Sequence, residues 1–72
     1  MFQFPIALTT QSDMKEFVEI ASSIKSDVYV KSGKLVGNAK SLLNVLATIE
    51  WDDLTVESDE DISSKFIKFM KE

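Results

Sequence analysis

Two hydrophobic periods alternate along this chain, and the alternation restricts the folds that it can form. Apolar residues at every second position between residues 2 and 8 predict a strand with one buried face. Residues 13–24 carry apolar side chains three or four positions apart, which predicts an amphipathic helix. Two strands separated by this 12-residue helix cannot be hairpin partners, so the chain must cross over a sheet between them.

A hairpin and a second, shorter helix are predicted next. Residues 27–31 are rich in β-forming side chains, residues 32–33 supply turn chemistry, and residues 34–36 return as the second arm. Residues 37–38 then break the strand pattern. The helix that follows has an apolar stripe made of Leu42, Val45, Leu46 and Ile49, with Leu43 outside the stripe.

The last third of the chain predicts one more strand and one more helix. Residues 51–53 are typical of a tight connection, and residues 54–56 alternate as a strand. Residues 58–61, Ser-Asp-Glu-Asp, place acids where the positive end of a helix dipole favours them, and lysines follow toward its negative end. We therefore expect the final helix to open at residues 58–61.

The resulting order, β-α-β-β-α-β-α, predicts an α+β fold of the open-faced β-sandwich type, in a single domain that spans residues 1–72. The last strand would insert between the first and the second, which gives a four-stranded antiparallel sheet. The three amphipathic helices would cover one face of this sheet. The other face would carry side chains that suit water, namely Gln3, Tyr29, Thr55 and Glu57.

Missing residue types exclude several kinds of chemistry. The chain has no cysteine, which excludes disulfides and thiolate metal sites, and it has no histidine and no arginine. Histidine is the usual general base near neutral pH, the commonest metal ligand and the usual phosphohistidine carrier. Arginine is the usual bidentate clamp for phosphate. We therefore expect neither an enzyme nor a site for a cofactor or a metal.

Charge and hydropathy indicate the class of partner. The 12 acidic and 8 basic side chains give a net charge of −4, which opposes binding to nucleic acid. No apolar run approaches the roughly 18 residues of a membrane span, and no secretory signal is visible. We expect a cytoplasmic protein whose partners are other proteins, with no nucleic acid and no membrane.

Residues 38–43, Asn-Ala-Lys-Ser-Leu-Leu, resemble the serine-site segment of HPr, the phosphocarrier protein of the bacterial sugar phosphotransferase system. Three other features agree with that family in order and approximate spacing. They are Phe17-Val18 followed by Ala21-Ser22, then Ser26-Asp27-Val28 at the start of the second strand, and Asp59-Glu60 at the opening of the last helix. The resemblance covers residues 17–72, and the family has the same order of strands and helices. It implies the HPr fold and a bacterial source.

The loop after the first strand departs from the family. There the family carries a phosphoacceptor histidine, followed by an arginine and a proline that open the first helix. Counting back from Phe17 puts Thr10 or Gln11 at the acceptor position. Ser12 or Asp13 stands where the arginine and the proline would be. None of these side chains can form a phosphoramidate, so the resemblance implies a relative without a phosphohistidine relay.

Ser41 is the candidate regulatory site. It precedes an apolar helix and can cap that helix by accepting a hydrogen bond from a backbone N–H two or three residues on. Relatives that lack the histidine and keep this serine act as regulators of carbon catabolite repression, so the resemblance implies a phosphorylation switch. A phosphate at a helix N-terminus would add a charge of about −1.5 to −2, which the adjacent Lys40 could help neutralise. The alternative interpretation is that Ser41 only caps this helix and is not phosphorylated.

The residues around this serine are candidate partner contacts. Leu43 lies outside the buried stripe and should be at least partly exposed, whereas Leu46 is expected to be mostly core. In the HPr family, apolar residues of this short helix form the docking surface for partner proteins. The resemblance therefore implies contacts through Lys40, Leu42, Leu43 and Leu46, with an HPr-type kinase or a transcriptional regulator as partner.

Two acidic groups have plainer structural explanations. Asp52 and Asp53 beside Trp51 fit a solvated turn better than a catalytic carboxylate pair. Residues 59–61 fit a helix start better than a metal site, since EF-hand spacing is absent.

Three functions remain open. The first is a regulatory or protein-interaction domain of the HPr type, with Ser41 as its candidate switch and no phosphohistidine transfer. The second is a purely structural HPr-fold binding module without phosphorylation. The third is a phosphocarrier with a different acceptor, such as Thr10 or Ser12, although a hydroxyl phosphoester is a far poorer donor than a phosphoramidate.

Overall fold

A computed structural model of the chain describes residues 2–51 and 53–70 and contains four strands and four helical segments. The strands are β1 (Phe2–Ile6), β2 (Val28–Ser32), β3 (Leu35–Asn38) and β4 (Leu54–Ser58). The helices are α1 (Gln11–Ser22), α2 (Leu42–Ala47) and the 3-10 helices η1 (Thr48–Glu50) and η2 (Ser63–Phe69). This is the predicted order, with η1 added directly after α2.

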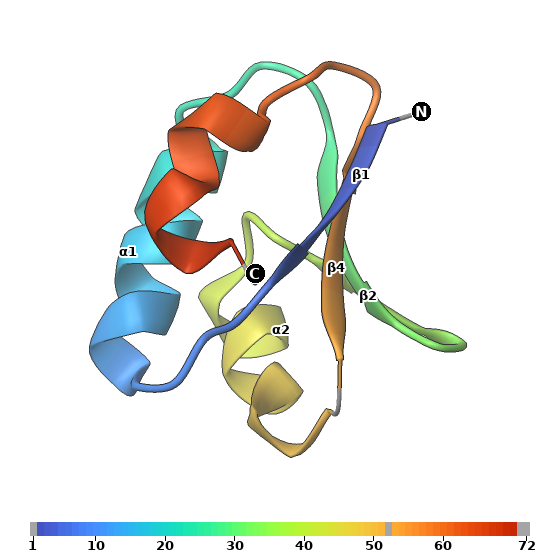
Figure 1. Cartoon of the computed structure of the whole chain (residues 1–72). Coiled ribbons are helices and arrows are strands. Elements are labelled where there is room, and N and C mark those ends of the chain that lie inside the picture. Colours follow the sequence, from blue (N-terminus) through green and yellow to red (C-terminus); the bar gives the residue numbers. More distant parts are fainter. Residues whose placement is uncertain (1, 52, 71–72) are drawn as a thin grey trace.

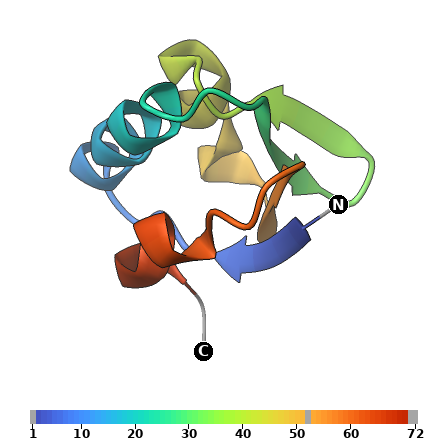
Figure 2. The same ribbon diagram turned by 90° about the horizontal axis from the view of Figure 1, so that it is seen from above.

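The sheet has the predicted split arrangement. Its strand order is β1-β4-β2-β3, and every neighbouring pair is antiparallel, so β4 lies between β1 and β2. Figures 1 and 2 show α1, α2 and η2 on one face of this sheet, while the other face is left uncovered. The prediction of an α+β, open-faced β-sandwich is confirmed.

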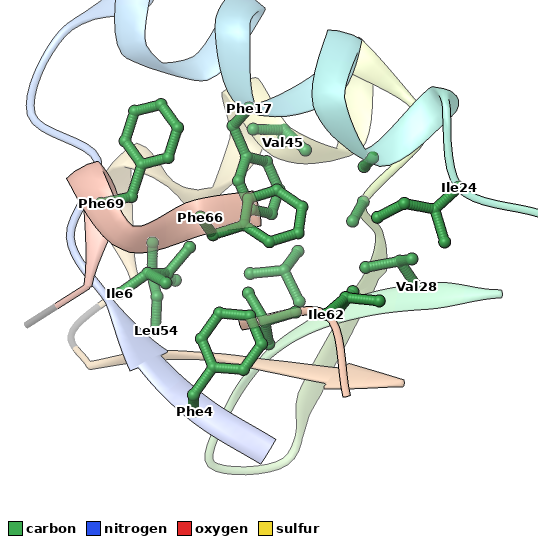
Figure 3. Close-up of a cluster of buried hydrophobic side chains, with 14 of the residues drawn as sticks. Phe4, Ile6, Phe17, Ile24, Val28, Val45, Leu54, Ile62, Phe66 and Phe69 are labelled. Carbon is green, nitrogen blue, oxygen red and sulfur yellow. The ribbon is translucent and has the colours of Figure 1, made fainter. Parts of the chain in front are cut away.

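The core lies between the sheet and the helices, where the apolar stripes of both meet. Phenylalanine rings from three elements gather at its centre: the ring centroid of Phe66 lies 5.0 Å from that of Phe17 and 5.9 Å from that of Phe4 (Figure 3). The other buried apolar side chains are Ile6, Met14, Ala21, Ile24, Val28, Val30, Ala39, Val45, Leu54, Val56, Ile62 and Phe69. The core is therefore continuous, and it receives side chains from β1, α1, β2, α2, β4 and η2.

The first helix begins two residues earlier than predicted. α1 runs from Gln11 to Ser22 because Thr10 caps it, with its hydroxyl accepting the Asp13 backbone N–H at 3.1 Å. The Asp13 carboxylate in turn accepts the backbone N–H and the hydroxyl of Thr9. Asp13 is thus bonded through its backbone to Thr10 and through its carboxylate to Thr9, and the apolar pattern alone did not reveal this cap.

The β2–β3 hairpin is longer than predicted, and its strands continue past the expected break. Residues 37–38 extend β3 and pair with Val30 and Tyr29. Gly37 is buried, and the Trp51 ring lies 3.5 Å from the position that a Cβ on Gly37 would occupy. The pairing of Gly37 with Val30 thus outweighs the low strand propensity of glycine.

The final helix differs most from the prediction. β4 continues to Ser58, which pairs with both β1 and β2, so residues 59–62 form a connection and the acids lie ahead of the helix. η2 begins at Ser63 and is a 3-10 helix with a break at Phe66 (φ −118°, ψ 19°). Sheet pairing of Ser58 on two sides outweighs the preference of neighbouring acids for a first helical turn.

The open face of the sheet holds Gln3, Tyr29, Thr55 and Glu57, but Glu57 is not solvated. Glu57 is only 9% exposed, because two side chains lie against its carboxylate. The Gln3 amide donates a hydrogen bond to it at 2.6 Å, and the Lys31 ammonium donates another at 3.2 Å. These two interactions, the Gln3 hydrogen bond above all, hold the pKa of Glu57 below its usual value.

Three predicted features fall beyond this description. The side chain of Ile49, the whole of Asp52 and the ends of the predicted domain at residues 1 and 71–72 lie outside the described residues.

Candidate functional site

Ser41 lies at the N-cap of α2. Its backbone is extended (φ −104°, ψ 115°), and its hydroxyl accepts the Asn44 backbone N–H at 3.4 Å. A second hydrogen bond reaches the same oxygen at 3.3 Å from the side-chain amide of Asn44. Ser41 is partly exposed, and both hydrogen bonds end on its oxygen, so neither of them occupies the hydroxyl proton. Phosphorylation of Ser41 stays a prediction.

The helix behind Ser41 is shorter than the apolar stripe suggests. α2 has six residues and passes at Thr48 into η1. The hydroxyl of the buried Thr48 donates to the Val45 carbonyl at 2.6 Å, which accompanies the tightening of the last turn. Because α2 is short, Ser41 is close in the chain to both β3 and η1, and residues 38–44 form what we call the corner around Ser41.

The leucines of α2 divide between solvent and core. Leu43 is 80% exposed and Leu42 is 37% exposed, whereas Val45 is buried and Leu46 packs partly buried against the core. The expected exposure of Leu43 is confirmed, and the expectation that Leu42 belongs to the buried stripe is wrong. α2 thus presents two neighbouring leucines outward, directly after Ser41.

Lys40 stands on the other side of Ser41 and is partly exposed. Its backbone N–H donates to the Asn38 side chain at 2.9 Å, which ties the connection between β3 and α2. All 12 acidic residues of the chain lie outside residues 28–49, a segment that contains Lys31, Lys34 and Lys40. Of these lysines, Lys31 is paired with Glu57, and Lys40 is the one that adjoins Ser41 in the sequence.

The two residues predicted to stand at the position of the missing phosphoacceptor, Thr10 and Gln11, lie at the start of α1. Thr10 is the exposed N-cap of that helix and Gln11 is its exposed first residue. The hydrogen bond from the Thr9 hydroxyl is the main cause that lowers the pKa of Asp13, with the Thr9 backbone N–H contributing next. A carboxylate that stays charged near this helix start opposes a phosphoryl group there by like-charge repulsion.

Two of the acids that follow β4, Glu60 and Asp61, have structural partners. The Glu60 carboxylate accepts the Ser26 hydroxyl at 2.6 Å, and Asp61 accepts the backbone N–H and hydroxyl of Ser63. Within residues 2–51 and 53–70, no cluster of three or more metal-ligating side chains and no pocket is present. None of the helices in the described part of the chain has the length and apolar character to cross a membrane.

Asn44 is the residue of this corner that the sequence interpretation missed. Its side-chain oxygen accepts the Asn38 backbone N–H at 3.0 Å, while its amide nitrogen donates to Ser41. The spacing Ser-x-x-Asn is close to the Ser-x-x-Glu spacing of a capping box, and this signal could have pointed to Asn44.

Comparison with known proteins supports one conclusion about this arrangement. No family model and no curated protein matches the chain. Among solved structures, the histidine-containing phosphocarrier protein of Mycoplasma is similar, with a TM-score of 0.69 and 18% sequence identity over 99% of this chain and 98% of that chain. The chain therefore has the fold of the histidine-containing phosphocarrier protein HPr, built from a sequence that contains no histidine.

Proposed function

We propose that residues 1–72 form one HPr-like domain that acts by binding other proteins, without phosphohistidine transfer, and that phosphorylation of Ser41 switches this binding. The fold supports the proposal, since it is that of the histidine-containing phosphocarrier protein, and the resemblance of residues 38–43 to the HPr family implies protein partners. Without imidazole no phosphohistidine can form, which favours recognition as the activity of this fold. The proposal includes a cytoplasmic location in a bacterium and no enzymatic activity.

The exposure of Leu43 is the observation that carries the proposal. A leucine that is 80% exposed contributes nothing to the core, and it stands two residues after Ser41 on α2. Exposed apolar side chains that stand together with a polar rim are typical of protein-binding surfaces. Leu42 and Leu43 would form the apolar centre of the surface, and Lys40 and Ser41 its polar rim.

Phosphorylation would change the charge of this surface. Lys40 is the charged side chain among the residues of the proposed surface, so the unmodified surface suits a partner with acidic side chains. A phosphate on Ser41 would add about −1.5 to −2 charges beside Leu42 and Leu43. The modified surface would then disfavour an acidic partner and favour a basic one.

The modification is tested by incubating the chain with an HPr-type kinase and ATP, followed by mass spectrometry of the intact protein. We expect one added phosphate, located at Ser41 and lost in the Ser41→Ala variant. Ser12→Ala is the matched control, because Ser12 is an exposed serine of α1 and its removal should leave the added phosphate in place. An unmodified mass, or a phosphate that survives Ser41→Ala, contradicts the switch.

The docking surface is tested separately by calorimetric titration with the same purified kinase. Leu43→Asp should weaken binding at least about tenfold, since it places a charge at the apolar centre. Ile67→Asp is the matched control, because Ile67 is 67% exposed on η2 and lies outside the proposed surface. Equal losses in both variants would show that α2 has no special role in binding.

The exposed leucines are equally compatible with a purely structural binding module that is never phosphorylated. This alternative predicts that Leu43→Asp weakens partner binding and that Ser41→Asp leaves partner binding unchanged.

A phosphocarrier that uses Thr10 or Ser12 is the other alternative, and the charged Asp13 carboxylate near them argues against it. Phosphoenolpyruvate and the first enzyme of the phosphotransferase pathway should leave the chain unlabelled, and labelling would reinstate this function.

A further inference from the structure

The side chain of Asn44 joins the cap of α2 to the end of β3. Its Oδ1 accepts the Asn38 backbone N–H at 3.0 Å, and its Nδ2 donates to the Ser41 hydroxyl at 3.3 Å. A backbone N–H can only donate, so the atom facing Asn38 has to be the oxygen, which determines the orientation of the amide. One planar group thus holds two parts of the chain at once.

Asn38 occupies a particular place in the sheet. It is the last residue of β3, which is an edge strand. The next residue, Ala39, donates its N–H to the Val28 carbonyl at 3.0 Å, toward the sheet. The Asn38 N–H donates instead to Asn44, on α2. Asn44 therefore satisfies a donor of the sheet edge that would otherwise be offered to solvent or to another chain.

The Ser41 hydroxyl is also constrained by Asn44. Its oxygen accepts both the backbone N–H and the side-chain amide of that residue, so both of its lone pairs are engaged. In phosphorylation by ATP, the bond from this oxygen to the γ-phosphorus forms while the bond to the departing ADP breaks, and the hydroxyl proton passes to a base of the kinase. The electron pair of the broken O–H bond forms the new O–P bond, and the serine oxygen becomes a bridging ester oxygen, which is a weaker acceptor than a hydroxyl, so both hydrogen bonds from Asn44 weaken.

After the transfer, the strong acceptors are the terminal phosphate oxygens, which lie farther from the serine backbone than the ester oxygen does. We expect the amide nitrogen of Asn44 to turn toward these acceptors. Because nitrogen and oxygen belong to one rigid amide, the same movement draws Oδ1 away from the Asn38 N–H.

We infer that Asn44 is a positioning residue that couples the chemical state of Ser41 to the end of β3, so that modification of Ser41 releases the Asn38 N–H at the sheet edge. The surface that responds to the switch then includes β3, where Val36 is exposed, as well as α2. The inference rests on the proposed function for its trigger, phosphorylation, but the coupling between Ser41 and Asn38 requires no kinase.

Amide hydrogen exchange followed by NMR tests the coupling in the unmodified chain. Ser41→Ala removes the acceptor that orients the Asn44 amide, and Asn44→Ala removes the amide itself. Each should accelerate exchange at Asn38 about fivefold, the effect of losing one net hydrogen bond. Ser41→Thr keeps the hydroxyl and should restore the original rate. In the double variant, exchange should be no faster than in Asn44→Ala.

The controls separate local coupling from general destabilisation. Ser63→Ala removes a hydroxyl that is bonded to Asp61 in a different part of the fold, and it should leave Asn38 unchanged. The Val30 amide in the sheet interior is the internal reference for each variant. Unchanged exchange at Asn38 in Ser41→Ala, additive effects in the double variant, or equal acceleration at Asn38 and Val30 would each overturn the inference. These results do not depend on whether a kinase modifies Ser41, so failure here and failure of the proposed function remain distinguishable.

Discussion

The ring centroid of Phe17 in α1 lies 5.0 Å from that of Phe66 in η2, and both side chains are fully buried. Phe66 also lies next to Phe4 of β1, so it joins three elements that are far apart in the sequence. η2 is a short 3-10 helix whose backbone is broken at this residue, so its own hydrogen bonds contribute little to its position. The contacts of Phe66 hold the last helix on the sheet.

Phe66→Ala should therefore lower the free energy of unfolding by about 3–5 kcal/mol, through lost apolar burial and the cavity left behind. Urea denaturation measures the change. Ile67→Ala is the control in the same helix, and because Ile67 is exposed the change there should stay within about 0.5 kcal/mol. Similar losses in the two variants would contradict this role of Phe66.

Glu57 should make the stability of the fold depend on pH. The Gln3 hydrogen bond, and after it Lys31, hold the pKa of Glu57 in the folded chain below 4.5, its value when unperturbed. A carboxyl with a lowered folded pKa stabilises the fold at pH above the unfolded pKa, and this contribution is lost as the pH falls through the lower folded pKa.

Glu57→Gln should accordingly reduce the fall in Tm between about pH 7 and about pH 3. Asp13, whose pKa is also lowered, titrates in both proteins, so the difference between the two melting curves isolates Glu57. An identical pH dependence in wild type and variant would exclude the contribution of Glu57.

The N-cap of α1 offers a third test. Thr10→Ala removes the oxygen that accepts the Asp13 backbone N–H, and it should reduce the free energy of unfolding by about 1 kcal/mol. Thr10→Ser keeps the oxygen and should retain most of the stability. Ser12→Ala, a neighbouring exposed position in the same helix, should change stability by less than about 0.5 kcal/mol. Thermal denaturation measures these changes. An unchanged stability of Thr10→Ala would disprove the assignment of Thr10 as the cap.

The two glycines should respond differently to alanine. Gly33 has a φ of +58° with open space around it, so Gly33→Ala should cost about 1–2 kcal/mol through backbone strain alone. Gly37 lacks a positive φ, and a Cβ there would meet its nearest neighbours at an ordinary 3.5 Å. Gly37→Ala should therefore change stability by less than about 1 kcal/mol. Urea denaturation, followed by Trp51 fluorescence, measures the loss of unfolding free energy in each variant. A larger loss in Gly37→Ala than in Gly33→Ala would contradict this account.

Much of the fold was predictable because the decisive signals are local. Two of these signals are the apolar alternation of residues 2–8 and the helical spacing of residues 13–24, and each acts within a single element. The lengths of the connections then favoured one strand order, in which the last strand lies between the first and the second. Of the candidate site, the capping position of Ser41 and the exposure of Leu43 followed from the same helical geometry. The part that could not be predicted is the bridge that Asn44 makes to Asn38, which requires knowing how α2 lies against β3.

The amino-acid sequence by itself determined the order of the strands and main helices, and it excluded phosphohistidine because the chain contains no imidazole. Both conclusions depend on which side chains are present and how they are spaced. Only the tertiary structure decided that Gly37 belongs to β3, that the acids after Ser58 precede the last helix, and that Glu57 is enclosed by Gln3 and Lys31. These outcomes arise from pairing and packing between residues distant in the sequence, which outweigh local propensities of a few tenths to about 1 kcal/mol.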